Sequence, residues 1–288
     1  MSTESAIHLS KHVPYVAVKL SLRDIGSIHD RLISQIKEQC EIEIAALKKP
    51  ADKSDQEWTD WVASAREKAF KITTTITGRD GSAFIGDTSA VFAATTLPDK
   101  ISSIFLSNVA AYQGFSGVEP KNRFTLNFDF TKPPLFDVGS ALSAPTANMT
   151  NLQVQGNRSA WIAGVQAAVE DVLKERKTQR KWLHRAFMYD LGLMVFGFPF
   201  AFYFCWKFSH FIDQHFSSMG GFIVGAVYLY VALLVINFYR GLFGYAKWAF
   251  PVAELTDNKD VAILHRAILS SIVISLAGRV IWEIFSHL

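Results

Sequence analysis

Alternating apolar and polar positions mark several strands in the first half of the chain. The run RFTLNFDF is the clearest, because Phe124, Leu126, Phe128 and Phe130 alternate with polar residues. Successive side chains of a strand point to opposite faces, so this pattern predicts one buried and one exposed face. Similar but weaker patterns predict further strands at residues 13–22, 71–77, 82–94 and 101–108. The GRDG sequence between the second and third of these predicts a hairpin turn.

The first predicted strand, residues 13–22, has a defined buried face. Val16, Val18, Leu20 and Leu22 share one side of it, whereas Tyr15 is out of phase. We therefore expect the four aliphatic side chains to lie inward and the tyrosine to lie outward.

Three other stretches repeat with a period near 3.6 residues and predict amphipathic helices. They cover residues 24–47, a segment that opens with the S-x-x-E capping box at Ser54, and residues 159–176. Strands that follow one another along the chain favour antiparallel pairing. The sequence thus predicts an α+β domain over residues 1–173, with an antiparallel sheet and helices on one face.

Two long apolar stretches follow this domain. Residues 186–206 contain Asp190 as their single charge, and residues 219–238 contain none. About 20 residues of helix span roughly 30 Å, the thickness of a bilayer core. We predict a two-helix transmembrane hairpin; the alternative is a pair of helices buried in a soluble protein.

The linker at residues 174–185 is densely basic, which bears on orientation. Lys and Arg accumulate on the cytoplasmic side of membrane helices, so both flanks of the hairpin and the α+β domain are expected in the cytoplasm, at a bacterial inner membrane. An anionic inner leaflet would bind these side chains electrostatically. The predicted headgroup contacts are Lys174, Arg176, Lys177, Arg180, Lys181 and Arg185.

The last segment, residues 261–286, allows two interpretations. Its uninterrupted apolar part is short and is bounded by Arg266 and Arg279. We favour an amphipathic helix that lies on the membrane or packs on the hairpin. A third transmembrane helix is the alternative, and residues 186–288 form the membrane region in either case.

Asp190 is the most informative residue of the hairpin. A carboxylate in a membrane helix is costly unless it is paired or lies near the headgroups. The second span runs back toward the same side, which places Asn237 and Arg240 at a similar depth. We expect Asp190 to contact one of these two residues and so fix the register of the hairpin. A solvated interfacial carboxylate and a proton pathway are weaker alternatives.

Small residues and a proline predict how the two spans pack. Gly221 and Gly225 form a GxxxG motif, which lets helix backbones approach closely, either within the hairpin or between copies of the chain. Pro199 predicts a kink in the first span. A homo-oligomer is therefore a possible assembly.

The sequence offers little that indicates catalysis. GRDGSAFIG lacks the endings and spacings of phosphate-binding loops, and the histidines have no metal-ligand spacing. A net charge of +3 and two cysteines argue for neither a nucleic-acid partner nor a disulfide framework. We expect no metal and no cofactor, and an enzyme is the least favoured class. The polar loop within residues 133–161 is the preferred place for a ligand.

The expected function follows from this layout. A cytoplasmic domain that binds a ligand or a protein partner would signal to a membrane hairpin, as a sensor or effector. The layout resembles that of bacterial membrane effectors of stress and antiphage systems, in architecture only. The alternative is a passive anchor that recruits a complex to the membrane.

Overall fold

The structure, a computed structural model, describes residues 9–134, 146–258 and 262–286. The chain divides into two compact units. The first unit comprises Met1–Thr131, Asn148–Thr178 and Ala253–Lys259; the second comprises Lys132–Ala147, Gln179–Val252 and Asp260–Leu288.

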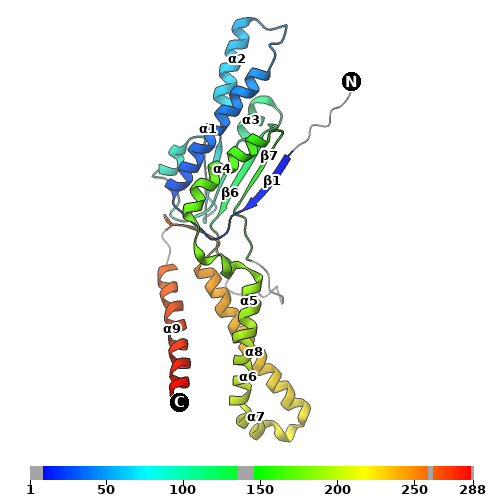
Figure 1. Ribbon diagram of the computed structural model, residues 1–288, viewed down its shortest axis with the longest axis vertical. Helices are drawn as coiled ribbons and strands as arrows, with labels where there is room; N and C mark the ends of the chain where they lie inside the picture. Colours follow the sequence, from blue (N-terminus) through cyan, green and yellow to red (C-terminus); the bar gives the residue numbers. More distant parts are fainter. Residues whose placement is uncertain (1–8, 135–145, 259–261, 287–288) are drawn as a thin grey trace. The chain divides into compact units, whose positions relative to one another are not determined.

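A six-stranded antiparallel sheet forms the centre of the first unit (Figure 1). The strand order is β1-β7-β6-β5-β3-β4. The strands are β1 (Leu9–Pro14), β3 (Thr73–Gly78), β4 (Ala83–Gly86), β5 (Ile101–Ser107), β6 (Arg123–Asp129) and β7 (Asn151–Gly156). The predicted hairpin exists as β3–β4, and Gly81 in its turn has a φ of +84°, which favours glycine.

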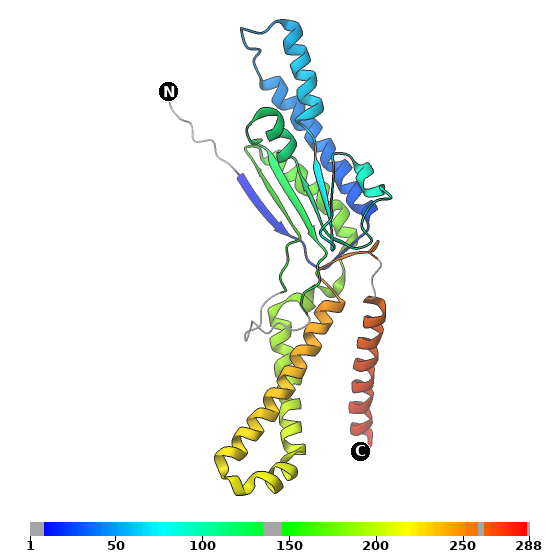
Figure 2. The same cartoon turned by 180° about the vertical axis from the view of Figure 1, so that it is seen from behind.

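Two long helices cover one face of this sheet (Figures 1 and 2). They are α1 (Leu22–Ala46) and α4 (Ser159–Arg176), and the antiparallel α+β fold is therefore confirmed. The helices of the unit are α1 (Leu22–Ala46), α2 (Asp55–Lys68), α3 (Val109–Ser116) and α4 (Ser159–Arg176), with a 3₁₀ turn at Ser89–Ala93. Capping boxes at Ser21 and Ser54 begin α1 and α2, because each serine hydroxyl accepts a backbone N–H three residues on.

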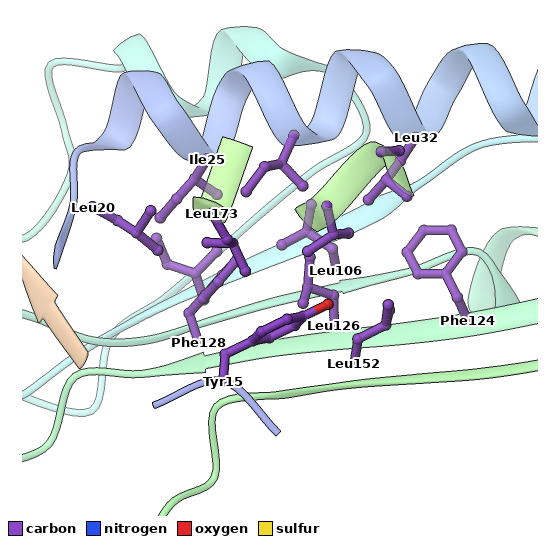
Figure 3. Packing of buried hydrophobic residues seen from close by; sticks show 14 of the residues in the cluster. Tyr15, Leu20, Ile25, Leu32, Leu106, Phe124, Leu126, Phe128, Leu152 and Leu173 are labelled. Carbon is purple, nitrogen blue, oxygen red and sulfur yellow. The ribbon is translucent and has the colours of Figure 1, made fainter. Parts of the chain in front are cut away.

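The core lies between α1, α4 and the sheet (Figure 3). Phe124, Leu126 and Phe128 of β6 are at most 1% exposed, while the residues between them are half-buried. The alternation of RFTLNFDF is thus the alternation of the sheet's two faces. Ile25 and Leu32 of α1 and Leu173 of α4 close the cluster from above.

The prediction for residues 13–22 was wrong in two respects. The stretch forms two strands, β1 and β2 (Val18–Leu20), because Ala17 adopts a φ of +61° that no strand can contain. This turn resets the alternation, so Tyr15 is buried and Val16 only half-buried. In Figure 3 the Tyr15 ring lies in the core, and its hydroxyl has no hydrogen-bond partner among the described residues.

Strand β2 does not join the large sheet. It pairs in parallel with β8 (Ala253–Leu255), a strand that follows the second apolar helix in the chain. Ala253 and Leu255 are buried in the core of the first unit. The sequence had predicted the first unit to end at residue 173, without this returning segment.

The second unit consists of helices and contains the two predicted apolar segments. Ala186–Lys207 and Gly221–Ala249 are long and apolar enough to cross a membrane. The elements are a 3₁₀ turn (Gln179–His184), α5 (Ala186–Gly192), a π-helical turn (Leu193–Gly197), α6 (Phe198–Lys207), α7 (Ser209–Phe216), α8 (Gly221–Ala249) and α9 (Ala262–Ser286). A 3₁₀ turn at Ser217–Met219 joins α7 to α8.

These helices differ from the expected spans in their details. Helix α8 continues to Ala249, beyond the predicted end at residue 238, and ends just before Pro251. The first span changes to π-helical hydrogen bonding directly before Pro199, which cannot donate a backbone hydrogen bond. Helix α9 exists, but its position in or on a membrane stays a prediction.

Candidate ligand hollow and membrane hairpin

The sheet face opposite α1 and α4 carries mainly polar side chains. One row across the strands runs from Thr73 through Ser107 and Thr125 to Gln153. The alternation of each strand sends these residues outward and the core residues inward. Phe105 on β5 is an exception on this polar face, with 40% of its surface exposed.

A hollow of about 550 Å³ lies on this face. Strands β3, β5, β6 and β7 form its floor, and α3 with the following turn forms a wall. This volume is in the range of sites for small molecules. Its lining residues are Thr73, Thr75, Phe105, Ser107, Val109, Ala110, Gln113, Glu119, Arg123, Phe124, Thr125, Gln153 and Gln155.

The charges in the hollow balance each other. The Arg123 guanidinium donates to the Glu119 carboxylate, and its Nε donates to the Gln155 Oε1 at 3.0 Å. The rest of the lining consists of neutral hydroxyls, amides and apolar groups. Amide and hydroxyl groups both donate and accept hydrogen bonds, so the hollow suits an uncharged polar molecule.

Among the described residues of the predicted ligand loop, 133–161, two line this hollow. Gln153 and Gln155 line it, but they belong to β7, a strand that the sequence analysis did not predict. Helix α3 was also missed, because its eight residues carry too short an apolar repeat. The central part of the loop, 135–145, lies outside the described residues.

Tyr239 joins the two apolar helices of the second unit. Its hydroxyl donates to the backbone carbonyl of Tyr189 at 3.0 Å, and the two rings lie 5.7 Å apart. A methyl group at Gly192 would collide with the Tyr239 hydroxyl, and one at Gly197 would press on Leu193. Leu193 belongs to the same span as Gly197, so the close approach between the two apolar helices takes place at Gly192.

The predicted contact of Asp190 remains a prediction. Asp190 and Arg240 directly follow Tyr189 and Tyr239, the residues joined by the hydrogen bond. Asp190 and Asn237 are exposed on the surface of the unit, and Arg240 is half-buried. The hydrogen bond thus brings the segments around Tyr189 and Tyr239 together.

The glycines of the predicted GxxxG motif, Gly221 and Gly225, have open space beside them, unlike Gly192. A methyl group at Gly221 or Gly225 would meet no atom within 4 Å among the described residues. Within one copy of the chain, the described structure therefore places no helix against the GxxxG motif. Self-association through this motif and a kink at Pro199 both stay predictions.

The basic linker residues differ in their contacts. Arg176 is paired with Asp24 of α1 at 2.9 Å, and Lys174 lies 3.6 Å from Asp171. Arg180 lies over the Phe250 ring, 4.4 Å from its centroid. Lys177, Lys181 and Arg185 are exposed, as headgroup contacts would need to be.

The chain leaves the first unit after Thr178 and returns to it at Ala253. The segments on both sides of this excursion pair with strand β2. Val18 forms a bridge with Lys177, and the Thr178 N–H donates to the Ala17 carbonyl at 2.7 Å. On the exit side, β8 pairs with the same strand. The Asn258 side chain then binds both backbone groups of Ile101, at 2.8 and 2.9 Å. The segments before the first apolar helix and after the second thus share one anchor.

Comparisons with known proteins give no relative. The chain matches no known protein family, no curated protein and no solved structure. Among the described residues, no group of three or more His, Cys, Asp or Glu side chains is placed to hold a metal ion. The features that bear on function are the hollow, the two apolar helices, and the pairing of β2 with Lys177 and with β8, which we call the β2 anchor.

Proposed function

We propose that this protein is a membrane-anchored sensor at a bacterial inner membrane. Its α+β domain, on the cytoplasmic side, binds a small uncharged polar ligand in the hollow, and the two-helix hairpin responds to that binding. The observation that best supports this proposal is the hollow of about 550 Å³ on the sheet face that α1 and α4 leave uncovered.

The lining of the hollow supports a ligand with a planar ring and hydroxyl groups. Phe105 offers an exposed aromatic face for stacking, and Gln113, Gln153 and Gln155 offer amides for hydrogen bonds. The ion pair between Arg123 and Glu119 gives no net charge, which favours a neutral molecule over an anion. Nucleosides combine these properties and serve as probes.

The membrane part of the proposal is supported by length and exposure. The two apolar helices have 22 and 29 residues, and at most 11% of their most apolar windows is buried. A core helix of a soluble protein would be mostly buried. The basic linker favours a cytoplasmic domain.

The β2 anchor supports a route from the ligand to the hairpin. Asn258, after the second span, binds Ile101, and Ile101 begins β5, the strand that carries Phe105. A shift of β5 on ligand binding would therefore act directly on the segment that leaves the hairpin. A passive anchor would not need this connection.

Thermal unfolding of the full-length protein in detergent, with adenosine, guanosine, cytidine or uridine, tests the binding site. A ligand at 100 times its Kd stabilises a protein by about 2.7 kcal/mol, so we expect a clear rise in Tm for at least one nucleoside. Phe105→Ala and Gln153→Ala should remove the rise. Ile85→Ala, on β4 and outside the lining, should keep it. Absence of any rise, or a rise that persists in Phe105→Ala, contradicts the proposed site.

The two cysteines test the signal to the hairpin. Cys205 lies in α6, whereas Cys40 is buried in α1, where burial raises the pKa of its thiol to about 11 and slows its alkylation. The rate of maleimide labelling at Cys205 should change when the stabilising nucleoside is added, and Cys40 should stay unlabelled. Binding without a change at Cys205 would favour the passive anchor.

A further inference from the structure

Two of the side chains that line the sheet hollow are charged, and they form an ion pair with each other. They are Glu119, on the turn after α3, and Arg123, at the start of β6. Their side chains are 53% and 37% exposed, respectively. Exposed ion pairs add little to stability, so this pair contributes little to the fold. Its larger effect is on which ligands the hollow accepts.

The turn that carries Glu119 is fixed on both sides. Gly117 ends α3 with a φ of +75°, and the Ser116 hydroxyl oxygen accepts the Val118 N–H at 3.3 Å. On the other side lies Pro120, which is buried, and a proline restricts the preceding residue to extended backbone. The Glu119 carboxylate is therefore held beside β6 before any ligand binds.

The charge of Arg123 is compensated where a ligand would meet it. Its guanidinium donates to the Glu119 carboxylate and, through Nε, to the Gln155 Oε1 at 3.0 Å. A guanidinium has five N–H groups, so Arg123 keeps donors for a further acceptor. A phosphate group bound there would also lie near the Glu119 carboxylate, whose repulsion opposes the attraction of the guanidinium. The loss of the phosphate's hydration is then not compensated.

The remaining lining is neutral and suits hydroxyl groups. Five of its side chains form no hydrogen bond within the part of the chain that the structure describes: Thr73, Thr75, Gln113, Thr125 and Gln153. These hydroxyls and amides can donate to and accept from the hydroxyls of a ligand. The first turn of α3 also lines the hollow, but a helix N-terminus carries only about half a positive charge, less than the full negative charge of Glu119.

We infer that Glu119 determines the specificity of the hollow, which binds a neutral hydroxyl compound and rejects the phosphate ester of the same compound. This inference rests on the proposed ligand site and names the reaction class that supplies its ligand. In that reaction, catalysed by a separate enzyme, water attacks the phosphorus of the ester. The bond to the ester oxygen breaks, this oxygen takes up a proton, and inorganic phosphate is released. The sensor therefore responds to removal of the phosphate group.

Isothermal titration calorimetry of the full-length protein in detergent tests this inference. The probes are adenosine, guanosine, cytidine and uridine, and the monophosphate of each. For a nucleoside that binds the unaltered protein, the monophosphate should bind roughly tenfold more weakly or worse. In Glu119→Gln the ratio of the two Kd values should fall by roughly tenfold, because Arg123 then forms charge-assisted hydrogen bonds with the phosphate. Glu38→Gln removes the same charge from the exposed surface of α1 and should leave the ratio unchanged.

A double variant and added salt separate an effect of charge from an effect of shape. Adding Arg123→Gln to Glu119→Gln should restore the preference for the nucleoside, because the cation that attracts the phosphate is gone. The affinity of Glu119→Gln for the monophosphate should also fall as the salt concentration rises, since salt screens exposed charges. An affinity that does not respond to salt would contradict an electrostatic role of Glu119.

The ratio in the unaltered protein needs no variant, so it decides the question even if a variant does not fold. Equal Kd values for nucleoside and monophosphate in the unaltered protein would overturn the role of Glu119 while keeping the ligand site. An unchanged ratio in Glu119→Gln, or an equal change in Glu38→Gln, would do the same. If none of the nucleosides binds, the proposed ligand site fails, and this inference fails with it.

Discussion

Phe128 and Phe222 are the same residue type in opposite surroundings. Phe128 of β6 is 0% exposed in the core of the first unit, whereas Phe222 of α8 is 89% exposed in the second. The first unit hides its large apolar side chains from the solvent, and the second presents them, including Phe202 and Trp206. Clustered exposure of this kind is costly in water and favourable in lipid. The surface of the first unit is therefore suited to water, and that of the second is suited to lipid.

Replacing one phenylalanine by alanine in each unit tests this comparison and has the largest expected effect. Phe128→Ala should lower the free energy of unfolding of the first unit by about 3–5 kcal/mol, because it removes a fully buried ring and leaves a cavity. Phe222→Ala should change the stability in detergent by less than about 0.5 kcal/mol. Thermal unfolding followed by circular dichroism measures both. A large loss in Phe222→Ala would show that this ring packs inside a protein.

Acid should affect the second unit through His184. Burial, and then the nearby charge of Lys247, lower the pKa of this imidazole to about 4 from an unfolded value of 6.5. The neutral form thus stabilises the fold above pH 6.5, and the stabilisation, up to about 3 kcal/mol, is lost as the pH falls toward 4.

Comparing Tm in detergent from pH 7.5 to pH 4.5 measures this effect. His184→Gln should flatten the decline, whereas the exposed His12→Gln should follow the unaltered protein. An unchanged decline in His184→Gln would contradict a buried neutral imidazole at this position.

Two glycines of the apolar helices sharpen the comparison within the second unit. Gly192→Ala should destabilise the hairpin by about 1–3 kcal/mol, because the new methyl group collides with the Tyr239 hydroxyl. Gly225→Ala meets no neighbour within 4 Å and should be neutral or slightly stabilising. Unfolding by increasing SDS in mixed micelles measures both variants. If Gly225→Ala destabilises instead, this glycine packs against a second copy of the chain.

The smallest expected effect concerns Asp190 and Arg240. If they contact each other, the double-mutant cycle of Asp190→Ala and Arg240→Ala should give a coupling free energy of about 0.5–2 kcal/mol. Asn237→Ala with Asp190→Ala forms the parallel cycle for the other predicted partner. Additive effects in both cycles would remove the predicted register contact.

Periodic patterns explain what the sequence analysis could predict. RFTLNFDF and the two apolar stretches each carry many repeats of one signal, and the capping box at Ser54 is a defined four-residue motif; all of them appear in the structure. The split at Ala17 and the pairing of β8 depend on single dihedral angles and on three-residue strands. Such short elements are set by tertiary contacts and have no period to detect.

The candidate hollow could be predicted only in part, for a related reason. Alternation identifies Thr125 and Gln153 as outward-facing once their strands are known. The strand order that places Thr73, Ser107, Thr125 and Gln153 in one row is a property of the whole sheet. The contact between Lys132 and the Trp248 ring likewise joins residues more than a hundred positions apart.

The pairing of β2 with β8 has a consequence for the order of synthesis. The Leu22 amide at the start of α1 donates to Asp257, 235 residues later, so the domain that precedes the two apolar helices is completed by a segment that follows them. At about 5–20 residues per second, the nascent domain waits on the order of ten seconds or longer for this strand. In that interval both apolar helices leave the ribosome. The first unit can therefore close with β8 only after both apolar helices have been translated.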